Sequence, residues 1–356
     1  MPRFISTVFC RWSFPVLIGA ILCLSGVSYG ADPATVAKIA AYDKPDRQAF
    51  LEAGARKEGQ LQVYTVGAQI DPVVKAFNIK YPFLSVRVLK NDVPQLVRRL
   101  AQEYKAGVHN VDVFEIDDYG MRPLLEAKIL APFRSPEMSS YASDSIETER
   151  HWVMMREDYA SLGFNTDAIP LDTAPRTNRD LLDQKWRGRM GISAAPSSIV
   201  LWVGALVMSE GEDFVRKLGR QELRIYNLGG RAVANLVVSG EAPVVVNNRR
   251  SHIYASRKEG AKVSWRALGP SYTAVSGTAL PIRANNPHAA MLFIDFLLSK
   301  EAQRIYAHEL GYASMRKDML SADAPAEKLY LTLRPDFPRE YEGWTRLTDT
   351  VFRRVR

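Results

Sequence analysis

The stretch LQVYTVGAQIDPVVKAFNIKYPFLSVRVL, residues 61–89, combines two periodicities. Residues 61–66 and 84–89 are short apolar runs rich in β-branched residues, a composition that is typical of strands. Between them, the Asp-Pro pair at 71–72 is a typical N-cap and first-turn pair, so we expect a helix over residues 73–81. A strand, a helix and a second strand in this order predict a βαβ unit with parallel strands.

The same rhythm continues along the chain. An amphipathic helix is expected over residues 94–106 and a third strand over 111–116. Further strands are expected over residues 159–164, 189–193 and 243–246, alternating with helices. This order predicts an α/β fold with open sheets, and such sheets bind ligands beyond the carboxyl ends of their strands.

The first thirty residues have the three parts of a cleavable secretion signal. Two arginines give a positive start, residues 14–24 form an apolar core too short to span a bilayer, and small residues precede the expected cleavage after Gly30. Both cysteines lie in this leader, so the mature chain is expected to lack disulfides and thiol ligands. Lipid anchoring at Cys23 ranks second, because Leu22 stands where a lipoprotein signal has a small residue.

The composition is that of an ordinary globular protein, with 47% hydrophobic and 24% charged residues. The formal net charge is +8, and loss of Arg3 and Arg11 with the leader leaves a charge of +6. No dense Lys/Arg tract, RNA-recognition signature or zinc-finger signature occurs, so we expect no nucleic-acid partner. The positive charge is better suited to one local site for an anion.

No enzymatic motif is supported by its context. A G-x-S-x-G string occurs at residues 26–30, but it lies in the leader and follows no strand. The five histidines have no metal-ligand spacing, and no H-E-x-x-H motif or Walker A loop occurs. We therefore expect neither an enzyme nor a cofactor nor a metal centre. A secreted hydrolase that uses acidic residues and a secreted adhesion protein are the alternatives from other classes.

Six landmarks occur in one order over residues 46–318: LQVYTV (61–66), DPVVKAFNIKYPFLSVRV (71–88), DVFEIDDYGMRPLLEAKILAPF (112–133), GFNTDAIP (163–170), LLDQKWRGRMGIS (181–193) and ANNPHAAMLFIDFLLSKEAQRIYAHELGY (284–312). Together they resemble the extracellular, or periplasmic, solute-binding proteins of ABC importers. Within that group, they are similar to the branch that contains ferric-ion-binding and phosphonate-binding proteins.

This resemblance implies the two-lobed type II fold of periplasmic binding proteins, in which each lobe is a mixed sheet flanked by helices. Two crossover segments join the lobes as a hinge, and the closed lobes present a ligand to an ABC permease in the inner membrane. We expect a helical arm over residues 31–60, lobe one over 61–156 and 278–320, lobe two over 161–274, and a tail over 321–356. The protein is expected to be a periplasmic monomer.

In lobe one, the loop after the first strand is a candidate anion contact through Thr65, Gly67 and Ala68. A helix begins directly after this loop, and its free N–H groups favour an anion. Asp117 follows the third strand and could accept a hydrogen bond from the amine of a zwitterionic ligand. Its neighbour Asp118 is expected to cap the next helix instead.

In lobe two, Ser197 and Ser198 open an apolar helix, where two hydroxyls and free N–H groups would hold an oxyanion. Simple capping is the alternative role of these serines. The Gly-Gly pair at 229–230 precedes another helix but lacks the G-x-G-x-x-G spacing of a nucleotide site. Tyr226 and Tyr272 are further candidates, although most tyrosines in a chain of this size pack in the core.

The segment Asn247-Asn248-Arg249-Arg250 follows a strand that is expected to be buried. In the ferric-ion-binding relatives, a pair of adjacent tyrosines occupies the corresponding place and ligates iron. Arginine cannot lose its proton to ligate a metal, but it forms forked bonds with carboxylate or phosphate-like oxygens. Adjacent residues of an extended segment point to opposite sides, so at most one of Arg249 and Arg250 is expected to face the cleft.

These features predict a protein that captures a small anion, either a phosphonate-like oxyanion or an organic acid, between its lobes. Its contacts would come from Asn247, Arg249 or Arg250 in lobe two and from the loops named above. Surface acids are the alternative partners of the two arginines. The alternative cargo is ferric iron or a ferric chelate, in which the arginines hold the anion and other oxygens meet the iron.

Overall fold

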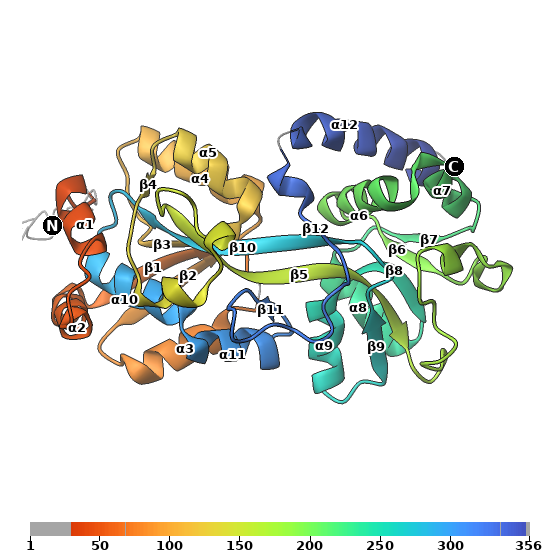
Figure 1. The fold of residues 1–356 in the computed structure, drawn as a ribbon, viewed down its shortest axis with the longest axis horizontal. Coiled ribbons are helices and arrows are strands. Elements are labelled where there is room, and N and C mark those ends of the chain that lie inside the picture. The colour runs from red at the N-terminus through yellow and green to blue at the C-terminus, as the bar shows by residue number, and fades with distance from the viewer. Residues whose placement is uncertain (1–29, 68, 335, 354–356) are drawn as a thin grey trace, which may run out of the picture.

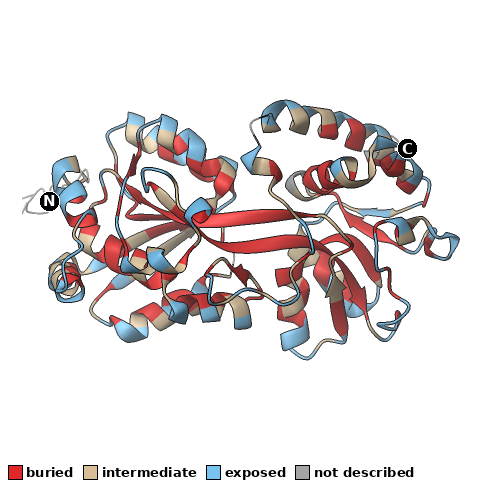
Figure 2. Cartoon of the chain, in the orientation of Figure 1, coloured by how far each residue is buried: buried red, intermediate tan, exposed pale blue. Residues whose placement is uncertain are grey.

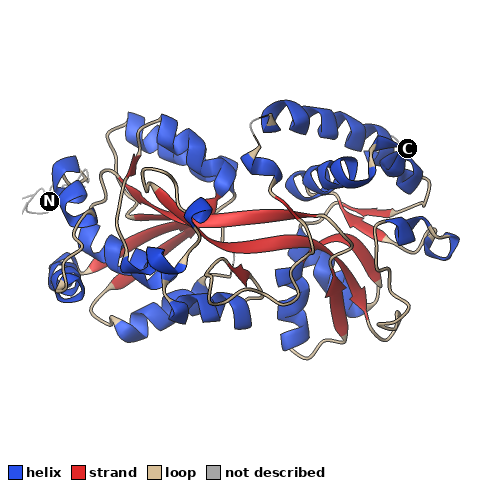
Figure 3. Cartoon of the chain, viewed as in Figure 1, coloured by secondary structure: helices blue, strands red, loops and turns tan. Residues whose placement is uncertain are grey.

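The computed structural model describes residues 30–353 except 68 and 335, and of Pro196, Ser197 and Arg353 it describes the backbone alone. The predicted secretion signal up to residue 29, with both cysteines and the alternative lipid anchor, lies outside the described residues, as does Ala68. The described chain has the predicted α/β fold. It forms two lobes side by side, with helices flanking the strands in each lobe (Figure 3).

One sheet runs through both lobes in the strand order β2-β1-β3-β10-β5-β8-β6-β7. Strands β1 to β3 of lobe one are mutually parallel, and so are β6 to β8 of lobe two. The long strands β5 and β10 pair in antiparallel fashion and pass from one lobe into the other (Figure 1). The strands are β1 Gln60–Thr65, β2 Ser85–Lys90, β3 Val113–Asp117, β4 Leu130–Ala131, β5 Trp152–Asn165, β6 Gly191–Ser193, β7 Arg224–Tyr226, β8 Val244–Arg249, β9 Val263–Arg266, β10 Ser271–Pro281, β11 Ala313–Ser314 and β12 Lys328–Leu329.

Helices α1 to α5, α10 and α11 belong to lobe one, and α6 to α9 belong to lobe two (Figure 1). Helix α12 belongs to the tail. The helices are α1 Pro33–Ala40, α2 Arg47–Glu58, α3 Asp71–Lys80, α4 Val93–Lys105, α5 Asp118–Glu126, α6 Pro196–Glu210, α7 Glu212–Gly219, α8 Gly230–Ser239, α9 Arg250–Lys258, α10 Pro287–Leu298, α11 Lys300–His308 and α12 Phe337–Thr348.

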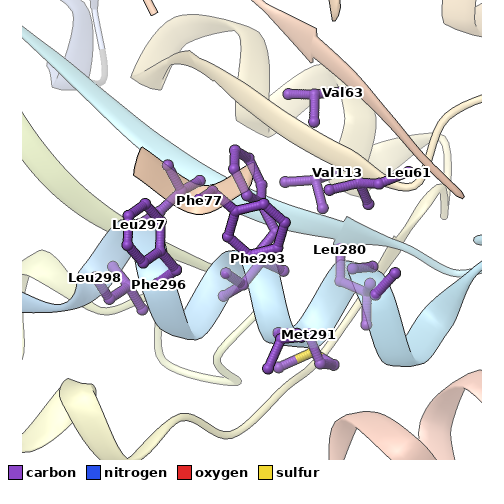
Figure 4. Close-up of a cluster of buried hydrophobic side chains, with 14 of the residues drawn as sticks. Leu61, Val63, Phe77, Val113, Leu280, Met291, Phe293, Phe296, Leu297 and Leu298 are labelled. Atoms are coloured by element: carbon purple, nitrogen blue, oxygen red, sulfur yellow. The ribbon is translucent and has the colours of Figure 1, made fainter. Parts of the chain in front are cut away.

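The βαβ unit predicted over residues 61–89 is confirmed by β1, α3 and β2, with ends that differ from the prediction by one or two residues. Helix α10 lies under this unit and is buried along most of its length because its sequence, PHAAMLFIDFLL, is apolar on nearly every side. The ring of Phe77 packs 4.8 Å from that of Phe293 and 5.4 Å from that of Phe296, measured between centroids (Figure 4).

The two hinge strands, β5 and β10, are buried throughout their middle sections (Figure 2). Their pairing shifts register between Ser276 and Gly277. A Cβ atom on Gly277 would lie 2.6 Å from the carbonyl oxygen of Val153, so only glycine allows the two strands to approach this closely here. The irregularity lies beside the end of β3 in lobe one, because Ser276 and Gly277 also pair with Asp117 and Ile116.

The tail after residue 320, which the sequence did not place, returns across the hinge to lobe two. Strand β12 pairs with β10 next to Ser271, and α12 then packs over α6 (Figure 1). Trp344 of α12 is 6% exposed, and its ring lies where a side chain on Gly204 of α6 would be. The apolar side chains Leu331, Trp344, Leu347 and Phe352 thereby join the core of lobe two.

Replacing Trp344 by alanine should lower the free energy of unfolding by about 3 kcal/mol, because the change leaves a cavity between α12 and α6. Leu333→Ala in the same tail is the control, since Leu333 is 51% exposed and should lose no more than about 0.5 kcal/mol. Urea denaturation followed by circular dichroism measures both. Equal losses in the two variants would contradict the packing of α12 as described.

Candidate functional site

The candidate site lies where the carboxyl ends of the parallel strands of the two lobes face each other. Strands β1 and β3 end at Thr65 and Asp117 in lobe one, and β6 and β8 end at Ser193 and Arg249 in lobe two. The hinge strands pair with β3 on one side and with β8 on the other, so they join these ends. Ligands of open α/β sheets bind at such edges.

A buried ion pair supports the lobe-one side. Glu115 in the middle of β3 is 0% exposed, and Nε of Arg156 from β5 donates to its Oε1 at 2.8 Å. The hydroxyls of Thr65 and Tyr306 also donate to Glu115, and the amide of Gly67 donates to Oγ1 of Thr65 at 2.7 Å. Thr65 and Gly67, expected to touch the ligand, therefore have partners within lobe one in this structure.

Next to this support lies an interlobe cluster of polar side chains: Asp117, Tyr119, Arg249, Tyr272 and Tyr312. Asp117 accepts a hydrogen bond from the hydroxyl of Ser276 at 2.5 Å. The guanidinium of Arg249 lies 4.8 Å from the ring centroid of Tyr272 and donates through Nη1 to the carbonyl of Asp158 at 3.0 Å. Asp117 and Tyr119 come from lobe one and Arg249 from lobe two, so the cluster joins the lobes.

Burial dominates the electrostatics of this cluster. It raises the pKa of Asp117, although Ser276 and the guanidinium groups of Arg156 and Arg249 act in the opposite direction. Burial also raises the pKa of the Tyr119 phenol, with a further contribution from the charge of Asp117. The pKa of Tyr312 rises to about 12, again mainly through burial. The phenols are therefore neutral at neutral pH unless a cation displaces their protons.

The two adjacent arginines point to different places. Arg249 is half-buried and joins the interlobe cluster, whereas Arg250 is 6% exposed and forms an ion pair with Asp323 of the tail at 2.8 Å. Burial alone would lower the pKa of Arg249, but Tyr272, Asp158 and Asp117 together hold it above its usual value. Arg249 is therefore the arginine of the pair that belongs to the interlobe cluster.

The other predicted lobe-two residues have mixed placements. Asn247 bridges β8 and β6, since its Oδ1 accepts from the amide of Ser193 at 2.8 Å and its Nδ2 donates to the carbonyl of Ser193 at 2.9 Å. Ser198 lies half-buried in the first turn of α6, and the backbone of Ser197 lies beside it. Tyr226 lies at the edge strand β7, where its ring packs against Gly191.

Three helices of lobe two begin at this edge of the sheet without a side-chain cap. They are α6, α8 and α9, and their N-cap residues are Ala195, Gly229 and Arg249. At α9 the amide of Ser251 already donates to Oδ1 of Asp158 at 3.2 Å, so α6 and α8 are the helix starts that could take an anion, where the helix dipole favours negative charge. Nδ2 of the neighbouring Asn248, a residue that is 1% exposed, likewise lacks a partner among the described residues.

A groove of about 590 Å³ separates the lobes on the side of α3 and α9. Gln69, Asp71 and Pro72 line it from lobe one, and Ala255, Lys258 and Glu259 line it from lobe two. Gln69 belongs to the loop after β1, so the groove brings solvent up to the loop in which ligand contacts were predicted.

Sequence reasoning missed Ser276, Asp158 and Tyr312. Ser276 and Tyr312 carry no local signal, because only pairing between distant strands brings them to Asp117 and Arg156. Asp158 did carry one: it belongs to the charged run Arg156-Glu157-Asp158 inside an otherwise apolar strand. Three buried charges in a row need partners, and this need marks a functional or structural junction.

The two-lobed fold with an interlobe cluster defines a ligand-binding protein whose lobes meet at a hinge. The chain matches the family described as "Bacterial extracellular solute-binding protein" over residues 110–340, which is more than half of its length. This protein therefore belongs to the bacterial extracellular solute-binding protein family and is a solute-binding component of an ABC transporter. No curated protein sequence matches the chain.

Solved structures with the same fold include iron-bound HitA from Pseudomonas aeruginosa, which is 22% identical with a TM-score of 0.65 and covers 82% of this chain and 99% of HitA. The substrate-binding protein of an ABC transporter from Agrobacterium tumefaciens is 14% identical with a TM-score of 0.68, and the similarity covers 81% of this chain and 94% of the Agrobacterium chain. Trichodesmium IdiA (FutA) in complex with iron and citrate is 18% identical with a TM-score of 0.59, covering 83% and 99%. These likenesses establish the fold.

Two further observations apply to the described residues alone. No helix among them is long and apolar enough to cross a membrane. Among the described residues, no group of three or more His, Cys, Asp or Glu side chains lies close enough together to hold a metal ion.

Asp118, beside the cluster, should make the stability of the protein fall as the pH rises. Burial raises the pKa of Asp118 to about 7, while the Thr332 hydroxyl, 2.5 Å from Oδ2, acts against the shift. An unfolded aspartate titrates near about 3.9, so the folded chain holds this proton more tightly and loses stability between about pH 4 and pH 7. Burial likewise raises the pKa of Asp112 to about 6, which adds to the decline.

Asp118→Asn should reduce the fall in Tm between about pH 5 and about pH 8, because asparagine keeps the shape but cannot titrate. Asp172→Asn, at an exposed position, is the control and should keep the slope of the unchanged protein. Thermal unfolding at several pH values measures the slopes. The same slope in Asp118→Asn as in the unchanged protein would show that this carboxyl does not titrate in that range.

Proposed function

We propose that this protein works in the periplasm and captures ferric iron together with a small anion, as a chelate, for delivery to an ABC permease. The observation that carries the proposal is the interlobe cluster, in which Asp117, Tyr119 and Tyr272 interact with the guanidinium of Arg249 and Tyr312 lies beside them on Arg156. Asp117, Tyr119, Tyr272 and Tyr312 would offer oxygens to the iron, and Arg249 would hold the anion.

The oxygen groups suit a hard cation. Carboxylate and phenolate oxygens are hard, negatively charged donors, and hard cations prefer such ligands. Because burial raises the pKa of Tyr119 and Tyr312, these phenols would lose their protons only when the metal binds. Binding would therefore release protons and strengthen as the pH rises.

The cationic groups suit the anion of the chelate. A guanidinium forms charge-assisted bonds with carboxylate or phosphate oxygens. It cannot ligate the metal itself, because arginine keeps its proton. The uncapped N-termini of α6 and α8 supply further donors on the same side as Arg249. Asn247 and the serines at 197–198 lie at this edge as supporting groups.

The relatives favour iron over a metal-free anion. HitA is described with iron bound, and Trichodesmium IdiA with iron and citrate. The second candidate cargo is a small oxyanion or organic acid without metal. It is supported by Arg249, one of the two adjacent arginines at the place where the resemblance implies a pair of tyrosines in the ferric-ion-binding relatives. Both cargoes would be held by closure of the lobes, since only the closed state lets both lobes touch the ligand.

Titration with ferric citrate, with citrate alone and with phosphate separates the two cargoes. Ferric citrate should bind and produce the visible charge-transfer absorption of tyrosinate on iron, whereas citrate alone should bind far more weakly. Tyr119→Phe should reduce this absorption, because it removes one oxygen, and Tyr226→Phe at the edge of lobe two is the matched control. Tight binding of citrate or phosphate without iron would favour the second candidate cargo instead.

Arg249→Gln should weaken the binding of ferric citrate ten- to hundredfold, which corresponds to about 1.5–3 kcal/mol for a lost bond to a charged group. Arg216→Gln is the control, because Arg216 lies on the surface of α7 in an ion pair with Glu212. Isothermal titration calorimetry at fixed pH measures both variants. Unchanged affinity in Arg249→Gln would remove the anion contact from the proposal.

A further inference from the structure

The tail from Ser321 onward touches both hinge strands before it reaches lobe two. The hydroxyl of Tyr159 on β5 donates to the carbonyl of Asp323 at 3.0 Å. Further along the tail, Lys328 and Tyr330 bind the carboxylate of Glu157 on β5 at 2.6 and 2.5 Å. Since α12 then packs on lobe two, the tail passes the hinge and ends on the lobe opposite to the one it left (Figure 1).

Asp323 is the best-connected residue of this crossing. Its two carboxylate oxygens accept from Nε and Nη2 of Arg250 at 2.8 and 3.0 Å, so the pair is bidentate. Nε1 of Trp265 donates to the same carboxylate at 3.0 Å, and the Ser321 hydroxyl does so at 2.5 Å. Bidentate pairs of this kind fix the geometry of both partners.

The guanidinium of Arg250 is also enclosed by aromatic rings. Its central carbon lies 5.7 Å from the ring centroid of Tyr159, 5.2 Å from that of Tyr254 and 5.5 Å from that of Trp265. Tyr159 belongs to the hinge, and the other two belong to lobe two. Arg250 is thus held on one side by the tail and on the others by a fixed aromatic frame.

The same arginine reaches lobe one. Its Nη1 donates to the carbonyl of Gly311, which follows α11. Two neighbours on α9 do likewise, since Tyr254 and Lys258 donate to the carbonyl of His308 at 3.1 and 3.0 Å. A Cβ atom on Gly311 would lie 2.6 Å from Tyr254, so the two lobes approach closely here.

We propose that the tail is an interlobe clasp, in which Asp323 positions Arg250 so that α9 of lobe two stays on the end of α11 in lobe one. The clasp favours the arrangement of the lobes seen here, in which Asp117 of lobe one and Arg249 of lobe two interact. Asp323 is a positioning residue, because it touches no group of the interlobe cluster and acts on Arg249 through Arg250.

The clasp would tune affinity without contacting the ligand. A protein that must close to bind has an apparent affinity reduced by the fraction of molecules in the competent state. Loosening Asp323 would raise the open fraction and weaken binding, whatever the ligand is. The effect on lobe separation is therefore independent of whether the cargo is a ferric chelate.

The test uses Asp323→Asn, which keeps the shape of the side chain and removes its charge. Asp336→Asn is the matched control in the same tail, because its ion pair with Arg339 is exposed on both sides. Small-angle X-ray scattering of the unliganded proteins measures the radius of gyration, and calorimetry measures the binding of ferric citrate. Thr332→Val is a second variant, which removes the hydrogen bond between the tail and Asp118 at the other end of the crossing. Its radius of gyration is measured in the same way.

Asp323→Asn should increase the radius of gyration of the unliganded protein and weaken the binding of ferric citrate about three- to tenfold, and Asp336→Asn should do neither. A lower Tm with an unchanged radius and unchanged affinity would overturn the clasp, leaving Asp323 with a merely structural role. If no protein binds ferric citrate but the radius still increases in Asp323→Asn, the clasp stands and the proposed cargo falls. Should Asp323→Asn fail to fold by circular dichroism, an unchanged radius in Thr332→Val overturns the clasp.

Discussion

Three consecutive buried charges in the hinge strand β5 connect the parts of this protein. Arg156 pairs with Glu115 of lobe one, Glu157 accepts bonds from Lys328 and Tyr330 of the tail, and Asp158 accepts bonds from the amide and hydroxyl of Ser251 in lobe two at 3.2 and 2.7 Å. A buried charge without a partner is costly, so each residue requires its own part of the chain to be in place. Because the strand alternates its side chains, Arg156 and Asp158 lie on one face of β5 and Glu157 lies on the other. The hinge is therefore the place where lobe one, lobe two and the tail are mutually oriented.

The adjacent arginines show how one short segment serves two purposes. Residue 249 ends β8 and residue 250 begins α9, so the backbone turns between them and their side chains diverge. Arg250 has structural partners, because its guanidinium pairs with Asp323 and donates to the carbonyl of Gly311. Arg249 is anchored by one bond to the backbone of Asp158 and otherwise faces Tyr272 and Asp117. In this arrangement only Arg249 belongs to the interlobe cluster, whereas Arg250 turns toward the tail.

The periodicity and the capping residues of the sequence were sufficient to predict those helices and strands that depend on neighbouring residues. The βαβ unit over residues 61–89 and the amphipathic helix expected over residues 94–106 follow from periodicity and caps, and both are present. The end of β3 was less well predicted: Asp117, not Asp118, is the N-cap of α5, and Asp118 instead bonds to Thr332 of the tail. Partners such as Asp323 for Arg250, 73 residues apart, leave no local trace. The weak pattern of the tail hid its role, because its apolar residues fit the core of lobe two only after the chain has crossed the hinge.

The charges of the interlobe cluster bear on the kind of cargo it could hold. A bare oxyanion would meet Arg249 favourably but would also face the carboxylates of Asp117 and Asp158, both of which interact with that arginine. A bare ferric ion would find oxygens at Asp117 and the phenols but would face the fixed positive charge of Arg249. A ferric ion that brings its own anion would suit both kinds of group. The anion would bind the guanidinium of Arg249, and the metal would replace the protons of the phenols. The same reasoning makes an arginine compatible with the proposed ferric cargo: Arg249 would meet only the anion, and the groups that would meet the metal come from other segments.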